Sequence, residues 1–278
     1  MFKFLKKTTA KSKYSSLAEL QQALVGLGFE YMNVIFGVDF TGSNNMTGAK
    51  SFNGKCLHEL SASIQNPYQF AIENTGQAIK FDQDNKYEMY GFGDSETSSH
   101  SVFSFSETSF NSASDCVNGY NNILNKGLSM SGPTSFAPII RKTIEQVREK
   151  WEFTLLIIIA DGAIADNLIE ENVAAIVEAS NYPIAITCVG VGDGPFDLME
   201  AFDDKIKGAK FDNFQFVNSE SLKSKYKKDQ EKFRQFYALE ILMELPKMFE
   251  EMKKNNILTK PQNLPPFNNP PKTLTHFH

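Results

Sequence analysis

The segment 154–161 constrains the fold more than any other stretch of the chain. It places six successive apolar residues before Asp161. Such a run, without polar alternation, is typical of a strand buried on both faces of a parallel sheet. Residues 33–39 and 184–191 show the same pattern, and segments with helical spacing alternate with them. The sequence therefore predicts an α/β fold: a Rossmann-like, doubly wound, mostly parallel sheet with helices on both faces.

Further elements are expected around these strands. Ser16 and Glu19 have the spacing of a capping box, which predicts a helix that ends at Gly28. Pro246 is expected to kink or break the last helix, because proline lacks an amide N–H and clashes with the preceding turn. The other expected elements are strands at 87–92 and 214–217 and helices at 139–150, 170–179 and about 229–254.

The two ends of the chain differ from the middle in composition. Residues 1–13 carry five lysines and no acid, although the whole chain has a formal net charge of −5. We expect a solvated basic tail there, with a weak electrostatic tether to anionic lipid as the alternative. Residues 255–278 hold five of the eleven prolines, which predicts an extended tail docked on the domain or on a partner. The expected domain spans residues 14–254.

Composition also excludes several classes of protein. The acidic balance argues against a nucleic-acid-binding surface, which usually shows a basic excess. The three cysteines, at positions 56, 116 and 188, are too widely spaced for a disulfide framework or a CxxC zinc site. No segment reaches the length of about eighteen apolar residues that a membrane span needs, and no signal-peptide core follows the basic start. We therefore expect an intracellular, cytoplasmic protein.

Acids and hydroxyls follow the strongest strands, at the sheet edge where ligands bind in such folds. Asp39, Thr41 and Ser43 form a DxTxS pattern, in which alternate residues of an extended loop point the same way. Thr134 lies just before a predicted helix, and Asp161 ends the strongest strand. Five oxygen ligands, two of them anionic, suit a hard divalent cation. These residues are the predicted metal site, for Mg²⁺ or Mn²⁺, with Ca²⁺ as a further candidate.

A series of short stretches along the chain follows a known pattern. The stretches are Tyr14–Leu17, Asp39–Asn44, Ser51–Gly54, Leu57–His58, Asn66–Tyr68, Tyr90–Asp94, Val102–Phe105, Ser131–Pro138, Val189–Pro195 and Phe211–Val217. They cover roughly residues 14–250 and resemble the copine family, whose domain is of the von Willebrand factor A type. The resemblance implies that the five predicted ligands form a metal-ion-dependent adhesion site, in which an Asp or Glu of a partner completes the coordination.

The resemblance is strongest to copine-like plant ubiquitin ligases, in which a zinc-binding RING finger follows this domain. A RING needs enough Cys and His ligands for two zinc ions. After Val217 the sequence has no cysteine and only His276 and His278. On this ground we expect that the protein is not an enzyme. The familiar copines also carry lipid-binding calcium modules ahead of the domain, where this sequence has thirteen residues.

Two functions are compatible with these observations. The first is a divalent-cation-dependent protein-binding domain that acts as an adaptor or as a subunit of a larger assembly. The small, polar loop 42–51 suits a surface that receives a partner. The alternative is a membrane-associated, calcium-responsive regulator that binds anionic phospholipid through residues 1–13. A purely structural role without metal is a third interpretation, and the sequence specifies neither the partner nor the oligomeric state.

Other features receive simpler interpretations. The glycine-rich stretch 189–194 lacks the GxGxxG spacing of a nucleotide site and is expected to pack near the metal site. His58 and His100 lie in polar stretches without a paired nucleophile, so we expect surface or capping roles for both.

Overall fold

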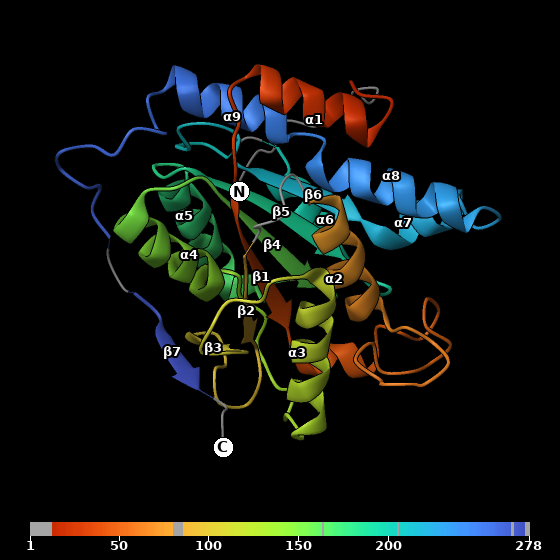
Figure 1. Ribbon diagram of the computed structural model, residues 1–278. Coiled ribbons are helices and arrows are strands. Elements are labelled where there is room, and N and C mark those ends of the chain that lie inside the picture. The colour runs from red at the N-terminus through yellow and green to blue at the C-terminus, as the bar shows by residue number, and fades with distance from the viewer. Residues whose placement is uncertain (1–12, 80–85, 163, 205, 268–269, 276–278) are drawn as a thin grey trace.

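A seven-stranded sheet organises the part of the chain that the computed structural model describes, residues 13–79, 86–162, 164–204, 206–267 and 270–275 (Figure 1). The strand order is β6-β5-β4-β1-β2-β3-β7. All neighbouring strands are parallel except β2 and β3. The predicted fold class is therefore confirmed. Of the predicted basic tail, only Lys13 lies within the described residues.

The central strands are buried along their whole length, as their uninterrupted apolar sequences predict. Every residue of β4 and β5 is buried. The β1–β4 register pairs Val38 with Ile159, so Asp39 and Asp161 leave the sheet at the same edge. The strands are β1 (Asn33–Asp39), β2 (Tyr87–Phe92), β3 (Ser101–Ser104), β4 (Thr154–Ala160), β5 (Ile184–Gly190), β6 (Phe214–Asn218) and β7 (Lys272–Thr275).

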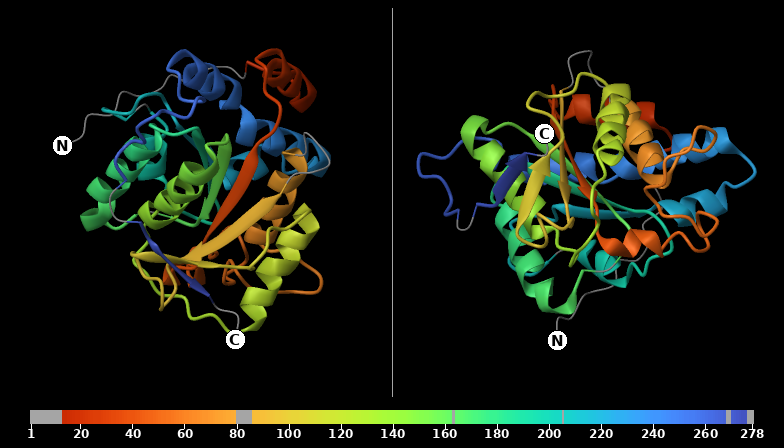
Figure 2. Two further views of the ribbon diagram at one scale, coloured as in Figure 1. Left: turned by 60° about the vertical axis from the view of Figure 1, so that its left-hand side comes forward. Right: turned by 90° about the horizontal axis from the view of Figure 1, so that it is seen from below.

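Helices cover both faces of the sheet (Figures 1 and 2). One buried cluster packs against α1, α2, α3, α8 and α9, and the other against α4, α5 and α6. No helix in the described ranges is long and apolar enough to cross a membrane. The helices are α1 (Leu17–Gly26), α2 (Pro67–Ala78), α3 (Ala113–Asn125), α4 (Ala137–Lys150), α5 (Ile169–Ala179), α6 (Asp197–Phe202), α7 (Ser219–Lys225), α8 (Gln230–Leu242) and α9 (Leu245–Lys254), with short 3₁₀ helices η1 (Gly42–Asn45) and η2 (Asp166–Leu168).

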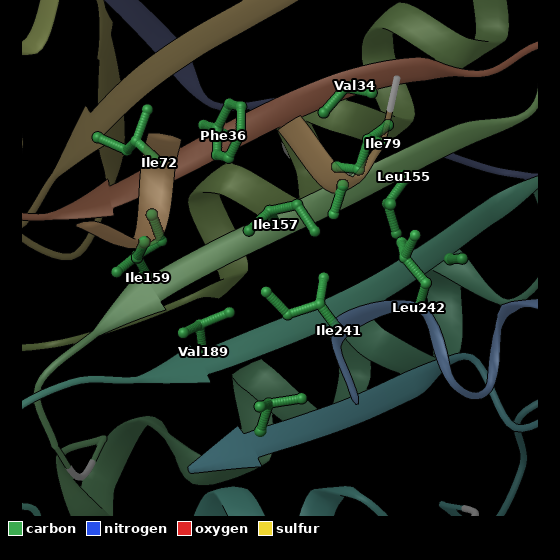
Figure 3. Close-up of a cluster of buried hydrophobic side chains, with 14 of the residues drawn as sticks. Val34, Phe36, Ile72, Ile79, Leu155, Ile157, Ile159, Val189, Ile241 and Leu242 are labelled. Atoms are coloured by element: carbon green, nitrogen blue, oxygen red, sulfur yellow. The ribbon is translucent and has the colours of Figure 1, made fainter. Parts of the chain in front are cut away.

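Alternate residues of each central strand enter opposite cores, because successive side chains of a strand point to opposite faces. Figure 3 shows Leu155, Ile157 and Ile159 of β4 on the face that also receives Ile241 and Leu242 of α8. The intervening residues of β4 belong to the cluster under α4 and α5. The two cores fix the sheet from both sides and therefore fix the edge at which the predicted metal ligands lie.

Several helix ends differ from the expectation. The Ser16 side chain accepts from the Glu19 N–H, as a capping box requires, but the Glu19 carboxylate bonds Ser15 instead of Ser16. The last predicted helix is two helices, and Pro246 lies in the first turn of α9, where its missing N–H costs nothing. The helices α2, α3, α6 and α7 and the strands β3 and β7 were not predicted from the sequence.

Residues 255–267 pass the C-terminal end of α4, and β7 follows them at the sheet edge; we name residues 255–267 and β7 the C-terminal strap. The Trp151 indole N–H donates to the Ile257 carbonyl at 3.0 Å. Arg148 donates to the Pro265 carbonyl at 2.5 Å, and its guanidinium lies 5.4 Å from the Phe267 ring centroid. β7 then pairs with β3 at the edge of the sheet. The proline-rich segment is therefore extended and docked on the domain, one of the two placements expected for it.

We predict that Arg148→Ala lowers the free energy of unfolding by about 2 kcal/mol, because it removes a charged donor from a carbonyl oxygen and a packing surface from the strap. Urea unfolding measures the difference. Limited proteolysis with chymotrypsin should also cleave the strap after Phe267 faster in this variant, because Arg148 packs on that ring. Arg234→Ala is the matched control, since Arg234 is exposed. Equal stability of the two variants would contradict the anchoring role of Arg148.

Candidate metal centre

The five predicted ligands meet at the carboxyl end of the sheet. The Thr41 hydroxyl lies 3.0 Å from that of Ser43 and accepts from that of Thr134 at 3.2 Å. Ser43 in turn donates to Asp161 Oδ1 at 2.9 Å. The backbone N–H of Thr41 donates to Asp39 Oδ1 at 2.8 Å. The five residues therefore form one continuous hydrogen-bonded cluster, which Asp39 joins through the Thr41 backbone N–H.

Local backbone structure explains how the hydroxyls reach the two acids. Thr41 has an extended conformation, and η1 begins directly after it, so the chain turns and brings Ser43 back toward the sheet. The Gly42 N–H donates to the Ser131 carbonyl at 2.6 Å, and Thr41 forms a parallel bridge with Ser131. This contact draws the loop that carries Thr134 against the DxTxS loop.

The two carboxylates are in an unfavourable position without a cation. Both side chains are fully buried. Burial, followed by repulsion from Asp161, holds the pKa of Asp39 well above its usual range. Burial also raises the pKa of Asp161, against the opposing effect of the hydroxyls of Thr47 and Ser43 that donate to it. Asp39 Oδ2 is buried and has no hydrogen-bond partner. A buried anionic oxygen of this kind fits a position beside a cation.

The chemistry of the donor set also limits the kind of metal. No group of three or more His, Cys, Asp and Glu side chains that could hold a metal occurs in the described ranges. The cluster offers two carboxylates and three hydroxyls instead. Hard oxygen donors of this kind suit Mg²⁺, Mn²⁺ or Ca²⁺ better than they suit zinc. The role of the five residues as metal ligands remains a prediction.

Two residues that the sequence analysis did not single out support the cluster. Thr47 donates to Asp161 Oδ2 at 2.5 Å. The Asn44 amide donates to the carbonyl oxygens of Thr41, at 3.0 Å, and Asp39, at 3.4 Å. Thr47 lies four residues after Ser43, so helical spacing in this loop could have indicated it. The Asn44 contacts depend on the turn at η1, which the local sequence does not reveal.

His58 was expected to have a surface or capping role, and its burial shows that the surface placement is wrong. Its side chain is buried, with Nε2 2.9 Å from the Asp39 carbonyl oxygen and Nδ1 2.7 Å from the Tyr120 hydroxyl. Burial lowers the pKa of His58 to about 3, against the effect of the Asp39 carbonyl, so the ring is neutral. His100, in contrast, is exposed as expected. The polar residues around His58 gave no indication of the aromatic rings that bury it.

The glycine-rich loop after β5 packs beside the cluster, which confirms its expected placement. The Asp193 N–H donates to the Thr47 carbonyl at 2.7 Å. The Asp193 carboxylate accepts from the backbone N–H groups of Lys50 and Ser51, each at 2.8 Å. These bonds tie the loop 42–51 to the next strand end along the sheet.

A close approach of backbone at Gly93 also shapes the site. Gly93 has a φ of +83°, a conformation that side chains other than glycine rarely adopt. A Cβ atom there would overlap the Thr41 methyl group and lie 3.4 Å from Asp39 Oδ1. Glycine therefore allows the loop after β2 to contact the two residues at the centre of the cluster.

Comparison with known proteins gives a family match over most of the chain. The model of the copine family matches residues 56–261. The chain is 42% identical to E3 ubiquitin-protein ligase RGLG2 of Arabidopsis thaliana, over 88% of this chain and 55% of that protein. It is 37% identical to Copine family protein 2 of Caenorhabditis elegans, over 88% of this chain and 3% of that protein. The chain spans about half the length of the first ligases it matches.

The names of these relatives contradict the expectation that the protein is not an enzyme. RGLG1, RGLG2, RGLG3 and RGLG5 of Arabidopsis are named E3 ubiquitin-protein ligases and are 38% to 44% identical to this chain. That expectation depended on the shortage of cysteine and histidine after Val217. A shortage of cysteine and histidine argues against a RING finger in this segment, but it does not exclude enzymatic activity.

A solved structure with a similar fold is the SpRpn10 VWA domain, with a TM-score of 0.46 and 13% identity over 68% of this chain and 87% of that one. The observed sheet order and helix layers agree with the predicted von Willebrand factor A type of fold. The family model and the sequence relatives together show that this chain belongs to the copine family.

Proposed function

We propose that the domain binds a protein partner through a divalent cation held by Asp39, Thr41, Ser43, Thr134 and Asp161. The observation that carries this proposal is the buried Asp39 Oδ2, which lacks a hydrogen-bond partner beside a second buried carboxylate. A divalent cation would neutralise both acids and accept a further oxygen ligand from an Asp or Glu of the partner. Mg²⁺ is the favoured ion, with Mn²⁺ and Ca²⁺ as competitors.

Exposed apolar side chains near the cluster support a protein as the partner. Met46 is 73% exposed, and its N–H donates to the Ser43 carbonyl, so it lies one turn from a candidate ligand. Leu60 and Ile64 are also exposed, and the Leu57 N–H donates to the Asn44 carbonyl, which ties their segment to the same loop. Exposed apolar side chains bordered by polar residues are typical of protein-binding surfaces.

The relatives suggest a context for this binding. Several are named E3 ubiquitin-protein ligases, and a ligase must recognise a protein. We propose that the copine domain of this chain contributes such recognition. The alternative of phospholipid binding through residues 1–13 concerns a segment that lies, except for Lys13, outside the described residues.

Millimolar Mg²⁺ should raise the melting temperature of the chain relative to EDTA, because a ligand that binds only the folded state stabilises it. The gain is about 2.7 kcal/mol when the free ion is about a hundredfold above its Kd. Asp39→Asn should abolish the response, since the amide lacks the charge that holds the cation. Differential scanning calorimetry in EDTA, Mg²⁺, Mn²⁺ and Ca²⁺ measures both effects.

Asp166→Asn is the matched control, because Asp166 is exposed and its substitution removes the same charge. This variant should keep the full response to Mg²⁺. A wild-type melting temperature that is the same in EDTA and in all three ions would refute the metal site.

Gly93→Ala should weaken the response to Mg²⁺, because the added methyl group displaces Thr41. Gly127→Ala is its control: Gly127 has a φ of +84° and nothing within 4 Å of a Cβ. Both variants should lose about 1 kcal/mol through backbone strain, and Gly93→Ala about 1–3 kcal/mol more through overpacking. Chemical unfolding without Mg²⁺ measures the loss of stability, and unfolding with Mg²⁺ measures how much of the response to the ion remains. An unchanged Mg²⁺ response in Gly93→Ala would show that Thr41 is not a ligand.

Met46→Glu should reduce capture of protein partners by the immobilised chain in Mg²⁺ while leaving the Mg²⁺-induced rise in melting temperature intact. The new carboxylate would repel an acidic partner group and remove an apolar contact. Val25→Glu on α1 is the control, because Val25 is 65% exposed and α1 lies at the end of the sheet where β1 begins, opposite the cluster (Figure 1). Quantitative mass spectrometry compares the proteins that EDTA elutes from each variant. Equal recovery from both would contradict a partner surface at Met46.

A further inference from the structure

A buried polar layer lies directly beneath the candidate metal centre. Two side chains donate to the Asp39 carbonyl oxygen: His58 through Nε2 at 2.9 Å and Asn44 through its amide at 3.4 Å. The Asn44 amide oxygen accepts from the Tyr68 hydroxyl at 2.7 Å. His58, Asn44 and Tyr68 are all buried. The peptide that carries Asp39 is therefore held from below by groups outside the predicted ligand set.

The hydrogen bonds of His58 define one tautomer. A carbonyl oxygen can only accept, so His58 Nε2 carries the proton that it donates to Asp39. Nδ1 is then the acceptor, and the Tyr120 hydroxyl at 2.7 Å donates to it. That hydroxyl is itself 3.3 Å from the Asn66 amide nitrogen, which donates to it. Both ring nitrogens and the phenol are thus satisfied in a single arrangement.

Aromatic stacking fixes the plane of the His58 ring. The ring centroid lies 4.0 Å from that of Tyr68 and 4.7 Å from that of Phe40, with interplanar angles of 20° and 18°. Phe40 is the residue that follows Asp39, so the stack and the hydrogen bond act on the same short piece of backbone. Rotation of the imidazole would break the bonds to Asp39 and Tyr120 together.

We propose that His58 is a positioning residue of the metal centre: its Nε2–H holds the Asp39 peptide, and through it the direction in which the DxTxS loop leaves β1. Thr41 and Ser43 follow within four residues, so a shift of this peptide would move three of the five candidate ligands. The inference rests on the proposed cation site. It assigns His58 a role in metal affinity in addition to its packing.

The test is a calorimetric titration of metal-free chain with MgCl₂, at a temperature at which every variant is folded. His58→Phe keeps the aromatic stack but loses both hydrogen bonds, and it should weaken Mg²⁺ binding about tenfold or more, as loss of an outer-shell partner usually does. His58→Gln retains a donor near the position of Nε2 and should recover part of the affinity. Tyr120→Phe removes one hydroxyl and should give a smaller loss in the same direction.

Ile176→Val in α5 is the stability control, because Ile176 is buried in the core on the opposite face of the sheet. It should lower the melting temperature without changing the Kd for Mg²⁺. A second readout needs no metal: long-range ¹H–¹⁵N correlation spectra of the metal-free chain should show His58 as the Nε2–H tautomer.

The outcomes separate the inference from the proposed function. A wild-type chain that binds none of the divalent cations overturns the proposed function and the inference with it. Wild-type binding with an unchanged Kd in both His58→Phe and Tyr120→Phe overturns the inference alone, as does an Nδ1–H tautomer at His58. If His58→Phe does not fold, the Kd of Tyr120→Phe for Mg²⁺ tests the inference: a weaker Kd than that of the wild type supports it, and an unchanged Kd overturns it.

Discussion

The parallel pairing of β1 with β4 is the constraint on which the candidate metal centre depends. Its register brings the ends of both strands to one edge and forces Asp39 and Asp161 into a shared, buried position. Two like charges in a low-dielectric environment repel each other, and neither has a basic partner in the cluster. The hydroxyls of two loops and, in our proposal, a cation offset this repulsion. The strand pairing therefore brings the two carboxylates close enough to repel each other, and the surrounding groups reduce that repulsion.

The cluster combines groups of two different origins. Asp39, Thr41 and Ser43 are close in sequence, so their convergence needs only one turn at η1. The layer beneath them comes from distant parts of the chain, since Tyr120 belongs to α3 and Tyr68 to α2. Rigid, packed residues of this kind determine how accurately a binding site is held.

The sequence predicted the elements that a single local pattern controls. Uninterrupted apolar runs predicted β1 with its exact bounds and β4 to within one residue, and the acids at their ends indicated the ligand cluster. The burial of His58 could not be predicted in this way, because it depends on rings from three other elements. The strand β7 was also missed, since Lys272–Thr275 lacks an apolar pattern and is held by main-chain bonds to β3.

The pairing of β7 with β3 has a consequence for how the chain folds. Ser101 is paired with Lys272, so most of the domain lies between the two strands in sequence. Such a contact closes a very long loop, and contacts of this kind form late in folding because the entropy of loop closure opposes them. Until then β3 presents an open edge, and open edges invite pairing with other chains. We expect the last strand to protect the newly made protein from aggregation at this edge.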